Sequence, residues 1–346
     1  MKILVVGDSY MAPRAFEQAF RRIEDDHTVE YIEIDRGRPF VPRSQSEKRL
    51  REYEGSPAEL VERLPGFDVL VVHGAPVTDE VLASDTLQLV CCARGGPVNV
   101  DLEAAASRGI PVVGTPGKNA GAVADQTLAF LIMLARRFPK AQRFLVDGGH
   151  VGSSAFEGAE YFGHDLRGHI LGLVGYGHVG REVATRAAAF GMSILVYDPY
   201  LDSEPAEPIV RVPDLDELLA RAEFVSLHLR ATPETEDLFG AEVFATMRPG
   251  AFFVNTARES LVDEHALADA LASGRLAGAA LDVTRPRHEA GPHPLLRHEN
   301  VVMTPHIGGA TYETLFRGSE MIADEILRFS AGEPLLHLAN PSGVTT

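Results

Sequence analysis

Short apolar runs rich in β-branched residues alternate with helical patterns along almost the whole chain of 346 residues. Continuous apolar strands of this kind are typical of parallel sheets, because helices cover both faces of such sheets. The predicted fold class is therefore α/β, with doubly wound parallel sheets. The expected strands are residues 3–7, 69–73, 89–92, 112–115, 171–175, 193–197, 224–229, 251–255, 278–283 and 301–304.

The spacing of these strands favours two sheets over one. A long helical segment, residues 120–137, separates a first group of about five strands from a second group of about six. Residues 138–168 are rich in Gly and His with little periodicity, which indicates an arm or an interface segment. The last helical pattern, residues 311–330, is expected to return to the first domain. Other helices are expected at residues 57–64, 101–108, 181–190, 214–221 and 263–272.

The net charge narrows the classes of partner. The chain has 32 basic and 49 acidic residues, a formal net charge of −17. Nucleic-acid binding depends on Lys and Arg neutralising phosphates, so no nucleic-acid partner is expected. Docking on an anionic membrane is disfavoured for the same reason. A local basic pocket for a small anion stays open.

The two cysteines, Cys91 and Cys92, are adjacent. This spacing excludes a disulfide framework and a thiolate metal site, and no metal is expected. Only four apolar residues, 3–6, follow the N-terminus, fewer than the roughly 7–15 of a signal peptide. The longest apolar run, residues 128–135, is too short to span a bilayer. We therefore expect a soluble, cytoplasmic protein with reduced thiols.

The segment Gly175–Gly180 reads GxGxxG and stands between a predicted strand and a predicted helix. In that context the first glycine, Gly175, permits a tight turn. The second, Gly177, lets a pyrophosphate approach the backbone, and Gly180 lets helix and strand pack closely. The helix N-terminus offers free N–H groups to the phosphates. The pattern predicts a dinucleotide site, with a glycine-rich turn that binds no ligand as the alternative.

Asp198 ends the next predicted strand, 18 residues beyond Gly180. A carboxylate there is placed to bind the ribose hydroxyls of the adenosine and to repel the 2′-phosphate of NADP. The predicted cofactor is therefore NAD. The alternative is an ordinary carboxylate at a strand end.

Several sequence blocks occur in an order that resembles one family, the D-isomer-specific 2-hydroxyacid dehydrogenases, and within it the branch similar to D-3-phosphoglycerate dehydrogenase. The resemblance covers nearly the whole chain and is strongest from about residue 90 to 312. The blocks are RGGPVNVD (94–101), LGLVGYGHVGR (171–181), VNTAR (254–258), ALDV (280–283) and TPHIGGAT (304–311).

The resemblance implies two similar α/β domains, with an NAD-binding Rossmann domain inserted into a flavodoxin-like substrate domain. We therefore expect the cofactor domain at residues 118–310 and the substrate domain at residues 1–117 and 311–346. The family's usual homodimer uses the long helix and the arm, here about residues 120–165.

The chemistry that the resemblance implies needs few protein groups, because the cofactor carries the hydride. A histidine suits the transfer of the hydroxyl proton, and a guanidinium suits the carboxylate and carbonyl oxygens. The resemblance assigns these roles to His306 and Arg258, which both follow predicted strands. A structural histidine and a structural ion pair are the alternatives.

The resemblance also assigns binding residues. The turn Arg94-Gly95-Gly96 is similar to the family's loop for the substrate carboxylate, since two glycines expose N–H donors. The alternative for Arg94 is a solvated surface charge. Asp282 corresponds to the residue that contacts the nicotinamide amide. The other cofactor-lining positions correspond to His178, Val179, Thr256, Ala257, Gly308 and Gly309.

One position departs from the family pattern. The family has a glutamate five residues after the aspartate that corresponds to Asp282, and it hydrogen-bonds the catalytic histidine. A gap-free match places that position on Arg287, whose cation would disfavour the imidazolium. Glu289 lies two residues further on and is in reach only if the loop is rearranged. Glu289 is kept as the third candidate catalytic residue, and both arrangements stay open.

The predicted function is an NAD-dependent oxidoreductase that interconverts a small D-2-hydroxy acid and its 2-oxo acid. The substrate is a small anionic molecule resembling a sugar acid, phosphorylated or not. The alternative is an NAD-binding regulatory or scaffold member of the family with weak catalysis, which the change at Arg287 keeps open.

Overall fold

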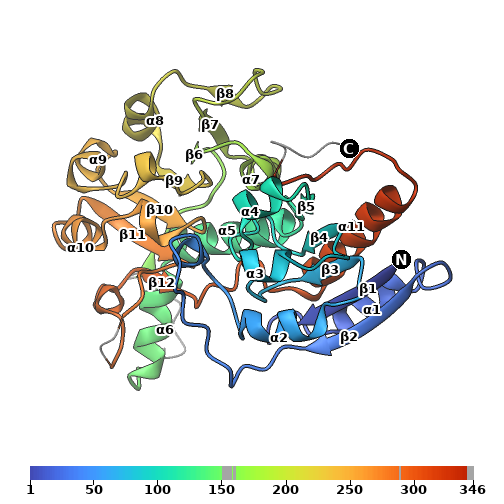
Figure 1. Ribbon diagram of the computed structural model, residues 1–346. Helices are drawn as coiled ribbons and strands as arrows, with labels where there is room; N and C mark the ends of the chain where they lie inside the picture. Colours follow the sequence, from blue (N-terminus) through green and yellow to red (C-terminus); the bar gives the residue numbers. More distant parts are fainter. Residues whose placement is uncertain (150–157, 159–160, 288–289, 341–346) are drawn as a thin grey trace. The chain divides into compact units, whose positions relative to one another are not determined.

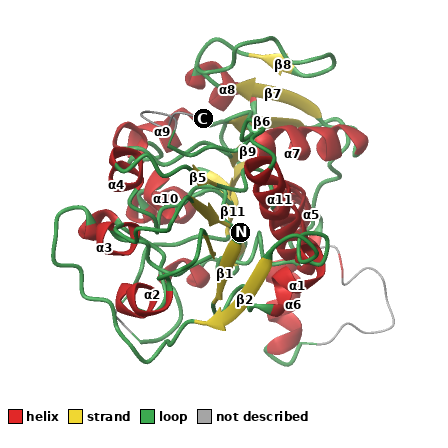
Figure 2. Ribbon diagram, turned by 45° about the vertical axis from the view of Figure 1, so that its right-hand side comes forward, coloured by secondary structure: helices red, strands yellow, loops and turns green. Residues whose placement is uncertain are grey.

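The computed structural model describes residues 1–149, 158, 161–287 and 290–340. These residues form two compact units. Unit 1 comprises Met1–Lys118 with Thr311–Thr346, and unit 2 comprises Asn119–Ala310. Strands and helices alternate in both units (Figures 1 and 2), which confirms the α/β class.

Unit 1 contains one parallel sheet in the order β2-β1-β3-β4-β5. Successive residues of a strand point to opposite faces, so the sheet needs apolar cover on both. Leu4 and Leu70 pack with one set of helices, and Ile3 and Val69 pack with the other. The strands are β1 (Lys2–Gly7), β2 (Thr28–Glu33), β3 (Val69–Val72), β4 (Leu89–Cys92) and β5 (Val112–Val113). The first set of helices is α2 (Pro57–Arg63), α3 (Asp79–Leu82) and α4 (Leu102–Ser107), and the second is α1 (Arg14–Phe20) and α11 (Tyr312–Ser330).

Unit 2 contains a parallel sheet in the order β12-β11-β10-β9-β6-β7-β8. When the strands are numbered in chain order with β6 as strand 1, the first six lie in the Rossmann order 3-2-1-4-5-6, from β8 to β11. The strands are β6 (Ile170–Val174), β7 (Ser193–Tyr197), β8 (Val210–Arg211), β9 (Phe224–Leu227), β10 (Ala251–Asn255), β11 (Leu276–Leu281) and β12 (Val301–Met303). One face packs against α5 (Ala120–Ala135) and α7 (His178–Ala189), and the other against α8 (Leu215–Arg221), α9 (Ala241–Thr246) and α10 (Glu264–Ala272).

The elements that the sequence did not predict are short or half-exposed. Strand β2 lies at the edge of its sheet and alternates exposed with partly buried residues, so it lacks the continuous apolar run of a central strand. Strand β8 has only two residues. The expectation of little periodic structure in residues 138–168 is wrong for α6 (Phe138–Val146). Helices α1, α3 and α9 were also not predicted.

Helix α11 confirms the expected return of the last helical pattern, because it packs against α1 within unit 1. In the part of the chain that the structure describes, no helix is both long enough and apolar enough to cross a membrane.

Candidate active site

The three glycines after β6 make a tight loop with one open side. Gly175 has a φ of +100°, and a Cβ on it would lie 2.7 Å from the carbonyl group of His228. A Cβ on Gly180 would lie 2.4 Å from the carbonyl oxygen of Gly175, so neither position tolerates a side chain. Gly177 has open space where its side chain would be. The backbone at Gly177 is therefore the part of the loop that a ligand can approach.

Helix α7 begins at His178, three residues earlier than predicted, with Gly177 as its N-cap. No side chain of a described residue caps this end. The first N–H groups of a helix have no partner inside the helix, so those of His178 and Val179 are available to an anion next to Gly177.

Asp198 follows β7 and points back to the glycine loop. Its carboxylate accepts hydrogen bonds from the backbone N–H of Tyr176 at 2.8 Å and from that of Tyr200 at 3.0 Å. Arg211 donates to the backbone carbonyl of Asp198 at 3.2 Å, not to its carboxylate. The negative charge of Asp198 is thus held beside the loop by two neutral donors.

Asp282 follows β11 and ties together the loop after β12. Its side chain is 2% exposed and accepts four hydrogen bonds. Two come from the backbone N–H groups of Ile307 (2.9 Å) and Gly308 (2.7 Å). The other two come from Thr304 Oγ1 (2.5 Å) and Gln126 Nε2 (2.9 Å). Three of these bonds are to Oδ1 and one, from Gly308, is to Oδ2, so most of the acceptor capacity of the carboxylate is used.

His306 lies inside this tied loop. Its backbone N–H donates to the carbonyl of Asp282 at 2.8 Å, and its φ is +56°, in the left-handed region that few non-glycine residues adopt. Asp282 therefore fixes an unusual backbone conformation at the candidate catalytic histidine.

Arg258 lies in the loop after β10, which Asn255 closes. Asn255 is 1% exposed; its Nδ2 donates to the carbonyl of Arg258 at 2.9 Å and its Oδ1 accepts from the N–H of Ala257 at 3.0 Å. Thr256 is buried and shares a hydrogen bond with Thr127 at 3.1 Å. The backbone around Arg258 is thus rigid, while its side chain is exposed.

The three loops meet at one edge of the sheet. β11 lies between β10 and β12, and the carboxyl ends of parallel strands share an edge. The N–H of Asp282 donates to the carbonyl of Asn255, and the N–H of Thr304 donates to that of Leu281, each at 3.0 Å. Unit 2 therefore brings the segments that carry Arg258, Asp282 and His306 together, as the sequence predicts.

Of the two candidates for the missing glutamate, Glu289 lies outside the described residues. Arg287 donates to the carbonyl of Pro292 at 3.3 Å. Nearby, Arg285 pairs with Asp237, and its N–H donates to Glu264 at 2.7 Å. Whether Arg287 or Glu289 acts on His306 remains a prediction.

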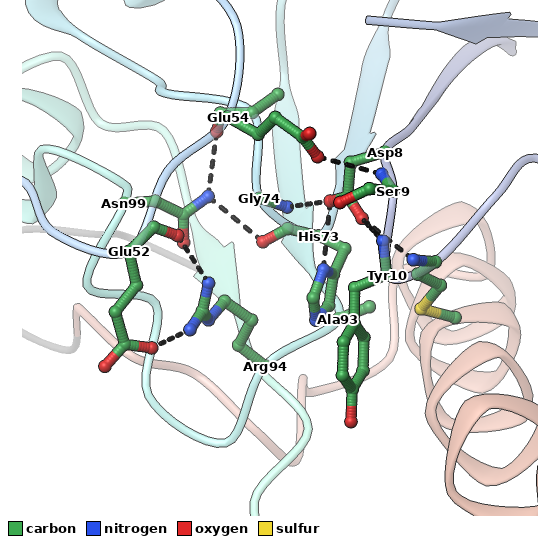
Figure 3. Close-up of polar contacts among 12 residues, drawn as sticks. Asp8, Ser9, Tyr10, Glu52, Glu54, His73, Gly74, Ala93, Arg94 and Asn99 are labelled. Atoms are coloured by element: carbon green, nitrogen blue, oxygen red, sulfur yellow. Dashed lines mark hydrogen bonds and ion pairs between the residues drawn. The ribbon is translucent and has the colours of Figure 1, made fainter. Parts of the chain in front are cut away.

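In unit 1, Arg94 follows β4 and is paired with Glu52 (Figure 3). Its guanidinium donates to the backbone carbonyl of Glu52 at 2.7 Å and to the carboxylate of the same residue. Gly95 and Gly96 are exposed, and Gly96 has open space around its Cβ position. The loop is accessible, but Arg94 is an ion-paired residue and not a solvated charge.

The same edge of unit 1 holds polar residues that the sequence did not single out. Asp8 and His73 directly follow β1 and β3, and the carboxylate of Asp8 accepts from His73 Nδ1 at 2.9 Å (Figure 3). Burial raises the pKa of Asp8, but hydrogen bonds from His73, Met11 and Gly74 outweigh that effect and leave the pKa below its usual value. The only sequence signal that could have marked these two residues is their position, since both come immediately after an apolar strand.

Lys118 is 6% exposed and donates to the carbonyl of Ala93 at 2.5 Å. Burial lowers the pKa of Lys118 to about 8. Burial also raises the pKa of Cys92 to about 12, and Cys91 is a free thiol like it. Among the residues that the structure describes, no group of three or more His, Cys, Asp and Glu is arranged to hold a metal ion.

Comparison with known proteins identifies the family. The family model "D-isomer specific 2-hydroxyacid dehydrogenase, NAD binding domain" matches residues 128–308. The chain is 37% identical to D-3-phosphoglycerate dehydrogenase of Archaeoglobus fulgidus over 285 residues. It is 40% identical to the Mycobacterium tuberculosis protein of the same name over 290 residues. Each alignment covers 82% of this chain and 53% of the relative.

The chain belongs to the D-isomer specific 2-hydroxyacid dehydrogenase family.

It spans about half of the length of the curated relatives that it matches. Among solved structures, the TT0316 protein of Thermus thermophilus is 35% identical with a TM-score of 0.76, covering 98% of this chain and 99% of that one. The NAD-dependent formate dehydrogenase of Staphylococcus aureus, solved in complex with NAD, is 27% identical with a TM-score of 0.73, and the match covers 100% of both chains.

Unit 2 is thus a dehydrogenase-family unit whose cofactor is NAD, and its geometry fits that cofactor. The open backbone at Gly177 and the uncapped start of α7 can hold the pyrophosphate. The carboxylate of Asp198 stands beside that loop, where a 2′-phosphate would be repelled.

Replacing Asp198 tests this basis for cofactor choice. In Asp198→Asn, which retains an acceptor oxygen for one of the two N–H groups, we expect the ratio of NAD to NADP binding to fall by about tenfold, because only the charge repels the extra phosphate. Fluorescence titration with NADH and NADPH measures the ratio, and the exposed Asp202→Asn is the matched control. An unchanged ratio in Asp198→Asn contradicts the assignment.

Proposed function

We propose that this protein is an NAD-dependent dehydrogenase that interconverts a small D-2-hydroxy acid and its 2-oxo acid. The observation that carries the proposal is the Asp282-tied loop, which presents His306 at the sheet edge that also carries Arg258 and the loops of an NAD-binding unit. The named relatives are D-3-phosphoglycerate dehydrogenases, which supports the same class of reaction. Nothing in the comparisons supports the alternative of a regulatory or scaffold protein.

The proposal gives unit 2 the cofactor together with His306 and Arg258, and gives unit 1 the further substrate-binding groups of the Arg94-Gly95-Gly96 loop. NAD, when bound, supplies the acceptor for the hydride that leaves C2 of the substrate. The cofactor-lining residues are Gly175, Gly177, His178, Val179, Gly180, Asp198, Thr256, Ala257, Asp282, Gly308 and Gly309. Asp282 acts mainly by positioning, since its carboxylate already accepts four hydrogen bonds, three from the loop after β12 and one from Gln126 of α5.

In this mechanism, the imidazole of His306 takes the hydroxyl proton during oxidation and returns it to the carbonyl oxygen during reduction. Arg258 binds the carboxylate and the reacting oxygen through its planar fork of donors. The N–H groups of Gly95 and Gly96, with Arg94, hold the substrate carboxylate in unit 1. A substrate carboxylate reaches Arg94 by displacing the carboxylate of Glu52.

We further propose a homodimer. Helix α6 and Phe162 expose large apolar side chains in a region that the sequence indicated as an interface. Such clusters on a soluble surface commonly mark contacts between proteins. The exposed residues are Phe138, Phe144, Leu145, Val146 and Phe162. The expected cytoplasmic location stays a prediction.

Substitution of the two catalytic candidates tests the reaction. We expect His306→Asn to retain NADH binding but to lower kcat by about 10²–10⁴-fold, because a positioned acid–base group contributes that much. Arg258→Ala should raise KM and lower kcat together, since the guanidinium binds both ground state and transition state. NADH oxidation with a panel of 2-oxo acids provides the rates, and His265→Gln, an exposed histidine, is the control. An unchanged rate in His306→Asn would remove this mechanism.

The pH dependence of kcat/KM distinguishes whether Arg287 or Glu289 lies beside His306. Reduction needs protonated His306, so kcat/KM falls as the pH rises through its titration. If Arg287 stands beside His306, Arg287→Glu should move this fall to higher pH, because a carboxylate favours the imidazolium. If Glu289 is the partner, Glu289→Gln should move it to lower pH and slow the reaction, while Arg287→Ala changes little. If no variant shifts the profile, neither residue is coupled to His306.

Disruption of the apolar surface on α6 tests the dimer. We expect the parent protein to elute at twice the chain mass of 37.4 kDa in size-exclusion chromatography with light scattering. Val146→Glu, at a residue 77% exposed, should shift it toward the single-chain mass, because a buried unpaired charge opposes association. Val41→Glu, at a residue 69% exposed in unit 1, is the matched control. A parent protein that elutes as a monomer would contradict the proposal.

A further inference from the structure

The residues that carry this inference lie where the strand order of the unit 1 sheet reverses. β1 lies between β2 and β3, so the chain leaves β1 toward one side and returns on the other. In doubly wound sheets ligands bind at the carboxyl ends of the strands on either side of such a point. Here these ends carry Asp8 and His73. The next strand in the sheet, β4, is followed by Arg94 in the candidate carboxylate loop.

Asp8 is a rigid support and not itself a ligand site. It is 2% exposed and accepts hydrogen bonds from the N–H groups of Tyr10 (2.9 Å), Met11 (2.8 Å) and Gly74 (2.5 Å), in addition to that from His73. A Cβ on Gly74 would lie 2.7 Å from the Asp8 carboxylate, so this contact requires a glycine. With four donors around it, the Asp8 carboxylate has no lone pair left for a substrate.

His73, in contrast, has one nitrogen that Asp8 does not use. Because Nδ1 donates to Asp8, Nε2 is the ring nitrogen that is directed away from that carboxylate and can hydrogen-bond a ligand. The ring of Tyr10 stacks on the imidazole at 5.0 Å with an interplanar angle of 9°. The ring orientation is therefore fixed from two sides, as Figure 3 shows, while the side chain keeps 11% of its surface exposed.

The charges around His73 do not suit a phosphate. Glu54 accepts from the N–H of Ser9 at 2.8 Å beside Asp8, and Glu52 lies at Arg94. The neighbouring cations already have acceptors in the protein: Arg94 has Glu52, and Arg36 has Glu54 at 3.3 Å. A phosphate dianion is recognised by cations in excess over carboxylates. A hydroxylated carbon needs only one hydrogen-bonding atom for its hydroxyl and an apolar surface for its C–H groups, and His73 and the partly exposed Tyr10 ring offer these.

We infer that His73, positioned by Asp8 and flanked by Tyr10, hydrogen-bonds through Nε2 to a hydroxyl on the chain of the substrate, so that the enzyme selects a hydroxylated, non-phosphorylated 2-hydroxy acid. This inference rests on the proposed dehydrogenase function and adds the class of substrate. It separates this protein from its relatives named for a phosphorylated substrate.

The experiment compares matched 2-oxo acids of three to six carbons with NADH as reductant. Each set contains a hydroxylated acid, its deoxy analogue and its terminal phosphate ester, such as hydroxypyruvate, pyruvate and 3-phosphohydroxypyruvate. For the parent protein we expect kcat/KM to be at least about tenfold higher for the hydroxylated acid than for either analogue, the effect of one well-made hydrogen bond.

His73→Phe keeps a ring against Tyr10 and removes both nitrogens. We expect it to raise KM for the hydroxylated acid about tenfold, with little change in kcat and little change for the deoxy acid. Asp8→Asn should have the same selective effect, since it releases the ring orientation. His73→Gln, which keeps an acceptor, should recover part of the preference and serves if His73→Phe does not fold. His265→Gln is the matched control.

The outcomes distinguish this inference from the proposed function. Preference for the phosphate esters, or an equal loss on all three acids in both folded His73 variants, overturns the inference and leaves the dehydrogenase function intact. If the parent protein oxidises NADH with none of the acids in the panel, both the inference and the proposed function are overturned.

Discussion

The buried carboxylate of Asp282 is the interaction on which the candidate active site depends. It collects two backbone N–H groups and two side-chain donors, and so fixes the loop after β12 in a conformation that includes a left-handed residue at His306. A left-handed non-glycine residue costs about 1–3 kcal/mol and persists only where its surroundings over-determine it. Here the strain lies at His306, the residue expected to move a proton. The hydrogen bonds to Asp282 are therefore needed to hold this residue in its place in the candidate site.

The same device occurs in unit 1. Asp8, like Asp282, comes directly after a strand, is buried, and accepts backbone N–H groups of its own loop together with a side-chain donor. A parallel sheet ends with all its strands at one edge, where loops must supply both ligand groups and their own rigidity. A buried aspartate supplies this rigidity, because its carboxylate oxygens accept hydrogen bonds from backbone N–H groups that no longer have a partner in the sheet.

Much of the fold and of the candidate site could be predicted from the sequence, since the sequence patterns that indicate them are local. The apolar runs indicated the central strands, the glycines after β6 indicated the dinucleotide loop, and the strand-end positions of Arg258 and His306 placed them on one edge. What the sequence could not show are the long-range partners. Gln126 meets Asp282 across 156 positions, and His73 meets Asp8 across 65. Edge strand β2 was missed because half-burial leaves no continuous apolar run.

The pairing of Arg94 with Glu52 changes the anion affinity that the sequence alone would lead one to expect of Arg94. As an isolated cation at a strand end, Arg94 would attract any small anion. Because Arg94 is paired with Glu52, it would exchange one carboxylate for another in the proposed substrate complex, so the Coulomb gain would largely cancel. In that complex the pair would contribute little net affinity and would favour an anion whose shape also satisfies the N–H groups of Gly95 and Gly96. Under the proposed function, selectivity would then have to come from the rest of the substrate, and the neighbouring strand ends of unit 1 would recognise its chain and not its charge.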